Sequence, residues 1–505
     1  MTEGKARRDV QVLAPSRARP FGTALRPLDK LGTVQAQDGA QDRPVTPRGV
    51  GELQRDPRIA PRTPVLEAMA GQLAPNTFGG HVLLVIPHFL KDLPPFVDQL
   101  EALGVTWENA FFVPVFYSRR EYVQRTLGQE GWQVLAATAF GPAFDQTVRS
   151  ALAEALYRAA SIRRRLMVLE DGGYAVPMLL REFADRLDFV AGAVEQTSNG
   201  CWRDREAVAG YEATHRRPIP FPIVAVGECA IKKVVEAPAV ADAVLQSVER
   251  LLMRDHKGLR GKRVAVMGYG AVGSRVAEAV RVRGASVGVF DRDQQKLVAA
   301  RNQGFEVPRL TLAGITDDDG HPVVCRLDVL PWEVKSRLEA GGPARWQGHR
   351  IWPKLAPDLS SFVSRHSVIL GTSGHCSVGA ELISALRHGT YLASCSSKRL
   401  EIDVVALEAQ AVAVESVAGV GTRYVLPSTD GQNRIITLLA DGFPVNFWGD
   451  DVESIPTEHI EFVWALMLHE LTRIAGGANR QMGLCAPDPW AAERVALLYL
   501  QHSRR

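Results

Sequence analysis

The sequence predicts an α/β protein with two doubly wound parallel-sheet domains. Three observations lead to this fold class. Apolar, strand-like runs alternate with helical stretches between residues 81 and 187. A strand, a glycine-rich turn, a helix and a second strand follow one another from Arg263 to Asp291. Further strand-like runs return after residue 366. Strands that alternate with helices are typical of parallel sheets covered by helices on both faces.

The composition is that of an ordinary globular protein with more than one domain. The chain has 505 residues, of which 46% are hydrophobic and 23% charged, and its formal net charge is +3. One hydrophobic core does not serve a chain of this length, and the near-balanced charge gives no reason to expect a nucleic-acid partner. The six cysteines are scattered, with no C-x-x-C pair, so we expect free thiols and no metal.

The start of the chain predicts neither export nor membrane insertion. No apolar run approaches the ~20 residues of a membrane-spanning helix, and the first residues lack the apolar segment of a signal peptide. We therefore expect a cytoplasmic protein without a membrane partner. Residues 1–63 are rich in Arg, Pro, Gly and Gln and show little apolar periodicity. Such a segment does not bury enough surface to offset its ordering entropy, so we expect a disordered basic tail.

Ordered structure is expected to begin near Val65. The apolar runs predict strands at 81–86, 110–116, 132–136 and 166–169. Helical periodicity predicts helices at 93–103, 119–128, 144–161 and 176–187. A helical, apolar segment from Cys229 to Met253 then connects this first α/β domain to the second.

The stretch Arg263–Asp291 organises the second domain. Its first glycine permits a tight turn, its second lets the backbone approach a pyrophosphate, and its third lets the helix pack closely on the strand. The helix N-terminus favours the negative charge of the phosphates. Asp291 lies about 21 residues after Gly270, where an acid can accept hydrogen bonds from ribose hydroxyls and would repel a 2′-phosphate. The pattern predicts a Rossmann domain that binds NAD, through Gly268, Gly270, Ala271, Val272, Gly273 and Asp291.

The rest of the chain is expected to complete both domains. A helix at 294–303 and a strand at 305–307 continue the nucleotide fold, and residues 308–365 interrupt it as an insertion. The sheet is expected to resume at 367–370, 391–394 and 411–414, with a helix at 379–388, and helices at 459–474 and 490–502 close the chain. We expect a substrate-binding domain from residues 64–245 and 448–505, and an NAD-binding domain from residues 246–447.

Five polar stretches outside the glycine turn lie at or near expected strand ends or on the connecting helix. They are residues 87–89, 170–173, 195–200, 232–236 and 371–375. Because the carboxyl ends of parallel strands form the ligand crevice, His88, Asp171 and the turn 195–200 should lie on one face. Each residue alone also has a structural explanation, as a strand-end histidine, a turn-forming aspartate or a solvated helix lysine.

Taken together and in this order, these stretches resemble the S-adenosylhomocysteine hydrolase family. The resemblance runs from about Leu83 to Ile474 and is interrupted by the insertion. It rests on an acidic-Asp-Gly-Gly motif, an acidic turn rich in hydroxyl residues, a lysine-bearing linker helix, the Gly-Tyr-Gly-x-Val-Gly fingerprint and two later runs. In this chain these are residues 170–173, 195–200, the segment around Lys232, 268–273, 401–403 and 438–446.

The resemblance implies a chemistry and a role for each matched residue. The family uses NAD to oxidise a ribose 3′-hydroxyl, removes the acidified 4′ proton, expels the 5′ thiol, adds water and reduces the ketone again. By resemblance Lys232, assisted by Glu236, would act at the 3′-hydroxyl, Asp171 at the 4′ proton and His88 near the 5′ position. Asp92 and Gln196 would contact the substrate. The residues implied to contact the cofactor are Thr197, Ser198, Asn199, Thr372, Ser373, Gly374 and Asn446.

The chain departs from the motifs of the family mainly at residues implied to contact the substrate, and less at residues implied to serve the redox step. Gln196 stands where the family has a glutamate, so it can form hydrogen bonds but cannot take up a proton. Glu236-Ala237 replaces an Asp-Asn pair, Leu90-Lys91-Asp92 replaces a Thr-x-Glu motif, and residues 394–397 replace an Asn-Ile-Gly-His segment. The true substrate is therefore open between adenosylhomocysteine and another nucleoside-like molecule.

Three functional hypotheses stay open. The first is a divergent NAD-dependent hydrolase of one-carbon metabolism that acts on a small nucleoside-like substrate. The second is a catalytically silent NAD-binding homologue with a regulatory role, and the third is an ordinary NAD-dependent dehydrogenase. Retention of His88, Asp171 and Lys232 favours the first over the second. The resemblance also implies a homo-oligomer.

We predict that the purified protein binds NAD with mid-micromolar or tighter affinity. Gly270→Ala should weaken binding, because a methyl group at this position blocks the approach of the pyrophosphate to the backbone. Isothermal titration calorimetry measures both affinities. Absence of binding in both proteins would contradict every hypothesis above.

Overall fold

The computed structural model describes residues 61–323, 326–396, 398–428, 431–449, 452–477 and 481–502. All of these residues belong to one compact unit of the chain. The predicted tail lies outside the described residues except for positions 61–63, and so does Ser397. Within the described ranges, no helix has the length and apolar character needed to cross a membrane.

The first sheet is entirely parallel and has seven strands in the order β18-β6-β5-β4-β1-β2-β3. Chain order reverses between β1 and β4, which is where a doubly wound sheet opens its ligand crevice. The strands are β1 (His81–Ile86), β2 (Ala110–Phe112), β3 (Gln133–Val134), β4 (Arg165–Glu170), β5 (Val190–Glu195), β6 (Pro222–Ala225) and β18 (Gly483–Cys485).

Helices cover both faces of this sheet because its central strands are apolar on both sides. Leu83 and Val85 of β1 belong to one core cluster, whereas Val82 and Leu84 belong to another. The helices are α1 (Pro64–Ala70), α2 (Leu93–Ala102), α3 (Glu121–Gln129), α4 (Pro142–Ser161), α5 (Ala175–Glu182), α6 (Ser198–His215), α7 (Ala230–Arg254), α14 (Thr457–Ala475) and α15 (Pro489–His502). Clusters on opposite faces of β1 follow from the period-2 alternation of strand side chains.

The second sheet also has seven strands, in the order β15-β16-β17-β14-β13-β7-β8. The five strands from β17 to β8 pair in parallel, whereas β15 and β16 are antiparallel additions. The strands are β7 (Arg263–Met267), β8 (Ser286–Phe290), β13 (Val368–Gly371), β14 (Thr390–Ser394), β15 (Ala413–Val417), β16 (Gly421–Leu426) and β17 (Arg434–Leu439). Chain order reverses between β7 and β13, as in a Rossmann fold.

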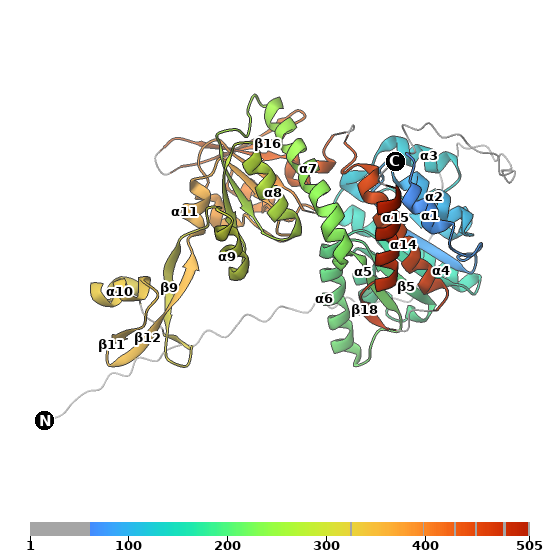
Figure 1. Cartoon of the computed structure of the whole chain (residues 1–505), viewed down its shortest axis with the longest axis horizontal. Helices are drawn as coiled ribbons and strands as arrows, with labels where there is room; N and C mark the ends of the chain where they lie inside the picture. The colour runs from blue at the N-terminus through green and yellow to red at the C-terminus, as the bar shows by residue number, and fades with distance from the viewer. Residues whose placement is uncertain are drawn as a thin grey trace. The chain divides into compact units, whose positions relative to one another are not determined.

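The helices of this second part are α8 (Ala271–Val282), α9 (Gln294–Asn302), α11 (Leu359–Ser364), α12 (Ala380–Ile383) and α13 (Val404–Gln410). Helix α8 lies beside the strands β7 and β8, and α9 lies beside β8 (Figure 1). Phe362 and Val363 of α11 pack with Ala265 and Ile369 in the core on one face of the sheet. The predicted fold class, two doubly wound sheets of which the second is a Rossmann domain, is confirmed.

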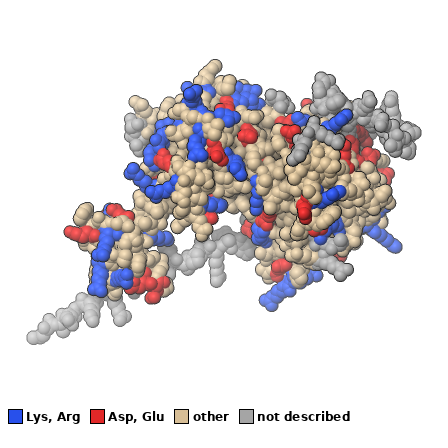
Figure 2. Space-filling view, viewed as in Figure 1, with Lys and Arg blue, Asp and Glu red and all other residues tan. Residues whose placement is uncertain are grey.

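The insertion forms a small antiparallel sheet of its own, in the order β10-β9-β12-β11. Its elements are β9 (Leu310–Thr316), β10 (Pro322–Val323), α10 (Trp332–Glu339), β11 (Ala344–Trp346) and β12 (His349–Pro357). Helix α10 packs on this sheet through Leu338, next to Ile315 and Ile351 (Figure 1). Positive and negative side chains are interspersed over the visible face of the molecule (Figure 2).

Some predicted elements are wrong in extent or missing. The strand expected at 110–116 ends at Phe112, because Pro114 has no N–H to donate to a neighbouring strand. The strand expected at 305–307 is reduced to a single bridge between Glu306 and Gly288. The helix expected at 379–388 is one turn, Ala380–Ile383. Strands β5, β6, β16, β17 and β18 were not predicted.

Two helical glycines provide a test of the turn geometry. A methyl group on Gly273 would lie 2.1 Å from the Gly268 carbonyl oxygen, whereas one on Gly128 of α3 would meet no atom within 4 Å. We predict that Gly273→Ala lowers the free energy of unfolding by ~1–3 kcal/mol through this clash. Gly128→Ala should raise it by ~0.5–1 kcal/mol, because alanine favours the helix. Urea denaturation measures both, and equal effects would contradict the close helix–strand contact.

Candidate active site

His88 and Asp171 meet where the first sheet reverses its chain order. His88 follows β1 and Asp171 follows β4, and Nε2 of the imidazole lies 3.0 Å from Oδ2 of the carboxylate. The hydroxyl of Ser118 bonds Nδ1 of the same ring. Phe447 stacks on the imidazole with the ring centroids 4.4 Å apart. The histidine is therefore fixed through both nitrogens and one ring face.

Asp171 is a buried carboxylate with one open oxygen. The residue is 3% exposed, and its Oδ1 has no hydrogen-bond partner among the described residues. Burial opposes ionisation, but the attraction of His88, and then of Lys232 and Lys398, outweighs it and lowers the pKa of Asp171. Asp171 is therefore held as a carboxylate whose free oxygen can accept a proton or a hydrogen bond.

Lys232 lies in the first turns of α7 and points to the same crevice. It is 8% exposed, and its Nζ donates to the carbonyl oxygen of Gln196. Glu236 follows one helical turn later, with its Oε2 3.3 Å from Nζ. Burial raises the pKa of Glu236, although Lys232 opposes this rise. A lysine beside a carboxyl that readily keeps a proton is an arrangement suited to proton transfer.

The Glu195 carboxylate holds the turn Asp171–Gly173 in place. Its oxygens accept hydrogen bonds from the N–H groups of Gly172, at 2.9 Å, and Gly173, at 2.7 Å. They also accept from the backbone N–H and the hydroxyl of Thr197. Thr197 in turn caps α6 by accepting from the N–H of Gly200 at 3.0 Å. These bonds fix the loops after β4 and β5 relative to each other.

The glycine turn after β7 has the geometry expected of a nucleotide site. Gly268 has a φ of +115°, and Thr372 donates to its carbonyl oxygen at 2.8 Å. Gly270 precedes the first residues of α8, Ala271 and Val272, and a side-chain carbon on it would meet no atom within 4 Å. The two oxygens of Asp291 accept from the N–H groups of Tyr269, at 2.6 Å, and Asp293, at 2.9 Å.

Asn199 connects the first sheet to the loop after β13. Its Nδ2 donates to the carbonyl oxygen of Gly374 at 2.8 Å, and its Oδ1 is buried without a partner among the described residues. Glu401 shapes the same loop, because its carboxylate accepts from Ser373 Oγ at 2.9 Å and from the Gly374 N–H at 2.6 Å. Ser198 donates to the Gly227 carbonyl at 2.7 Å.

The structure places three other predicted residues in contacts within the protein. Asp92 is 6% exposed and accepts from Trp464 Nε1 at 2.6 Å. Gln196 is 5% exposed and donates its N–H to the Glu170 carbonyl at 2.9 Å. Asn446 donates to Ser454 Oγ at 3.0 Å. The hydrogen bond from Trp464 gives Asp92 a structural role, because it joins the start of α2 to α14.

Lys398 and a group of aromatic side chains beside His88 were not predicted from the sequence. Lys398 is 5% exposed, and its Nζ donates to the carbonyl oxygen of Gly172 in the turn Asp171–Gly173. Tyr117 lies next to His88 and also against Phe443 and Phe447, with ring centroids 5.5 to 5.8 Å apart. The signal for Lys398 was its position directly after residues 394–397, where the chain departs from the family motif.

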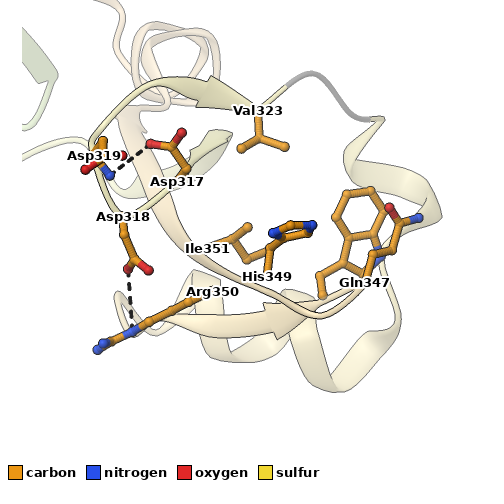
Figure 3. Close-up of a pocket in the computed structure, with 9 residues that line it drawn as sticks. Asp317, Asp318, Asp319, Val323, Gln347, His349, Arg350 and Ile351 are labelled. Carbon is orange, nitrogen blue, oxygen red and sulfur yellow. Dashed lines mark hydrogen bonds and ion pairs between the residues drawn. The ribbon is translucent and has the colours of Figure 1, made fainter.

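The larger of two described cavities lies in the insertion, away from these residues in the sequence and the fold. Its volume is about 420 Å³, and Trp346, His349 and Arg350 line it together with the turn Asp317–Asp319 (Figure 3). The Arg350 guanidinium lies 3.8 Å from the Asp318 carboxylate. We place the candidate active site at His88 and Asp171, because the buried titratable groups gather there and not in this cavity.

No protein-family model matches the chain. The chain is 27% identical to S-inosyl-L-homocysteine hydrolase of Methanopyrus kandleri over 189 residues, which are 36% of this chain and 41% of that protein. It is 27% identical to the adenosylhomocysteinase of Aquifex aeolicus over 285 residues, 55% of this chain and 53% of that one. An uncharacterized protein of Mycobacterium tuberculosis is 24% identical over 379 residues, 73% of this chain and 60% of that protein.

The chain thus spans between 41% and 60% of the length of these curated relatives, and its similarity to adenosylhomocysteinases is distant. Solved structures were also matched. A putative D-3-phosphoglycerate dehydrogenase from Ralstonia solanacearum is 12% identical with a TM-score of 0.37, covering 80% of this chain and 96% of that one. A dipicolinate synthase from Bacillus subtilis is 12% identical with a TM-score of 0.36, covering 79% of this chain and 98% of that one.

Asp92 provides a test of the buried electrostatics. Burial raises the pKa of Asp92 to about 6, well above the value of an unfolded aspartate. The folded state therefore binds its proton more tightly, and stability falls as the pH rises from about 4 to about 6. We predict that the free energy of unfolding of Asp92→Asn, relative to that of the wild type, rises by about 3 kcal/mol over this pH range, because each pKa unit corresponds to ~1.4 kcal/mol. Urea denaturation at several pH values measures the difference, and a pH-independent difference would contradict the prediction.

Proposed function

We propose that the protein is an adenosylhomocysteinase-like, NAD-dependent enzyme that acts on S-adenosylhomocysteine or a related nucleoside thioether. The reaction would proceed by transient oxidation of the ribose 3′-hydroxyl. The observation that carries this proposal is the convergence of His88, Asp171, Lys232 and Glu236 on one crevice. Two of these residues follow adjacent strands, and the other two lie one helical turn apart on α7. The distant similarity to adenosylhomocysteinases supports the same assignment.

The residues around the glycine turn fit the cofactor NAD. The open position at Gly270 leaves room for a pyrophosphate at the N-terminus of α8. Asn199 has a buried oxygen without a described partner, which suits an amide donor. Gly268, Gly273 and Asp291 would hold the adenosine end, and Ser198, Thr372 and Asn446 would contribute to the other end. NAD, when bound, would accept a hydride from the ribose and return it at the end of the cycle.

The protein's own groups would move the protons. The Glu236 carboxylate, whose raised pKa favours proton uptake, would take a proton from the Lys232 ammonium, and Lys232 would then take the proton of the 3′-hydroxyl. Asp171 would remove the 4′ proton with its open Oδ1. His88 would transfer a proton at the 5′ position, with Ser118 fixing its ring. Removal of the 4′ proton needs a carboxylate that is ionised before substrate binds, and the lowered pKa of Asp171 supports this role.

The domain assignment follows from the same proposal. Residues 64–245 with 448–505 would bind the substrate, and residues 246–447 would bind NAD. Phe447 and Tyr117 flank His88, and aromatic faces of this kind suit stacking with a planar ring. The homo-oligomer and the cytoplasmic location stay predictions.

We predict that the wild-type protein with NAD exchanges the 4′ hydrogen of added S-adenosylhomocysteine or S-inosylhomocysteine in deuterated water. Lys232→Ala should abolish exchange, because without the lysine the 3′-hydroxyl is not oxidised and the 4′ hydrogen is not acidified. Mass spectrometry of the recovered nucleoside measures the exchange.

Lys233→Ala is the matched control, since Lys233 is the exposed neighbour of Lys232 on α7 and should leave exchange unchanged. If NAD binds but the wild type exchanges neither nucleoside, the hydrolase proposal is overturned in favour of a silent NAD-binding homologue. Net reduction of NAD without exchange would instead favour an ordinary dehydrogenase.

A further inference from the structure

We propose that Lys398 is a positioning residue of the active site, which holds the Asp171–Gly173 turn from the nucleotide-binding half. The proposal deepens the proposed function and rests on the role given there to Asp171. Lys398 follows β14 of the Rossmann sheet, whereas Asp171 and Gly172 follow β4 of the other sheet.

Lys398 makes a direct hydrogen bond to the turn Asp171–Gly173. Its Nζ donates to the Gly172 carbonyl and lies 4.3 Å from the centre of the Tyr174 ring. Its backbone N–H donates to the Tyr117 hydroxyl at 3.3 Å. The residue has a φ of +69°, a left-handed conformation that a non-glycine residue adopts at a cost. That backbone conformation directs a long cationic side chain into the interior, where it is 5% exposed.

Lys398 faces several charged groups, and no carboxylate contacts it directly in the described ion pairs. Glu170, Glu195 and Asp204 approach from the ends of β4 and β5 and from α6, and Arg203 of α6 donates to the same Gly172 carbonyl at 3.1 Å. Tyr174 and Tyr117 complete the surroundings. Burial, then the repulsion of Arg203, lowers the pKa of Lys398 to about 7, although the three acids oppose this.

The charge of Lys398 reaches Asp171. Together with His88 and Lys232, it offsets the burial of that carboxylate and lowers its pKa. A neutral residue at position 398 therefore raises the pH at which Asp171 takes up a proton. The hydrogen bond to Gly172 and the charge are separable, because glutamine can still donate to the carbonyl but carries no charge.

The experiment compares Lys398→Met, Lys398→Gln and Lys398→Arg with the wild type. Protein labelled with ¹³C at the aspartate carboxyl carbons is titrated by NMR, and Asp171→Asn assigns the signal of Asp171. We expect the Asp171 midpoint to move to higher pH in the methionine and glutamine variants. It should stay at the wild-type value in the arginine variant and in the surface control Lys233→Met. Near-UV circular dichroism verifies that each variant folds.

The same variants are tested for 4′ hydrogen exchange of S-adenosylhomocysteine. We expect an acid limb displaced to higher pH in both neutral variants, with recovery in Lys398→Arg. At neutral pH the exchange rate should fall at least tenfold in Lys398→Met, which loses the hydrogen bond to Gly172, and less in Lys398→Gln, which keeps a donor. NAD affinity should change less than twofold. An unmoved Asp171 midpoint in a folded neutral variant overturns the assignment of Lys398. Absence of exchange in the wild type overturns the proposed function instead, and the carboxyl titration still decides the role of Lys398.

Discussion

The candidate active site depends on the hydrogen bonds that the buried Glu195 carboxylate accepts. It accepts from the N–H groups of two consecutive glycines after β4 and from Thr197 after β5. Two loops at the carboxyl ends of adjacent strands are thereby held in one arrangement. Gly200 must be a glycine, because a side-chain carbon there would lie 2.1 Å from this carboxylate. Asp171, one residue before the first bonded glycine, inherits its position from these contacts.

Burying this carboxylate beside others has an electrostatic cost that the surrounding residues offset. Oxygens of Glu170, Glu195 and Asp204 lie within 4.8 Å of one another. Burial is the largest cause that raises the pKa of each, and the hydrogen bonds that Glu170 and Glu195 accept oppose this rise. Neither oxygen of Asp204 has a described partner, and a carboxyl in that setting favours its protonated form. Arg203 and Lys398 supply the positive charge that the remaining carboxylates require.

Local pattern was sufficient for the fold and for part of the site. The glycine turn at Gly268 and the apolar runs of β1, β4 and β7 identify parallel strands, because a strand buried on both faces is continuously apolar. The strand-end rule then brings His88 and Asp171 to one crevice without any tertiary information. Strand β16 was harder to predict, since its burial is neither continuous nor strictly alternating. The sequence marked only the neighbourhood of Lys398, because its contact with Gly172 joins positions 226 residues apart, which local pattern does not show.

The Gly172 carbonyl receives donors from both halves of the chain, Arg203 from α6 and Lys398 from beyond β14. The aspartate proposed to be catalytic is thus supported by a segment that its own sheet does not supply. The two halves are therefore not interchangeable modules, although each is wound in the same order around its own crevice. Recombining either half with a related partner would preserve both folds yet leave the Asp171 turn without one of its supports, unless a lysine is kept at the position of Lys398.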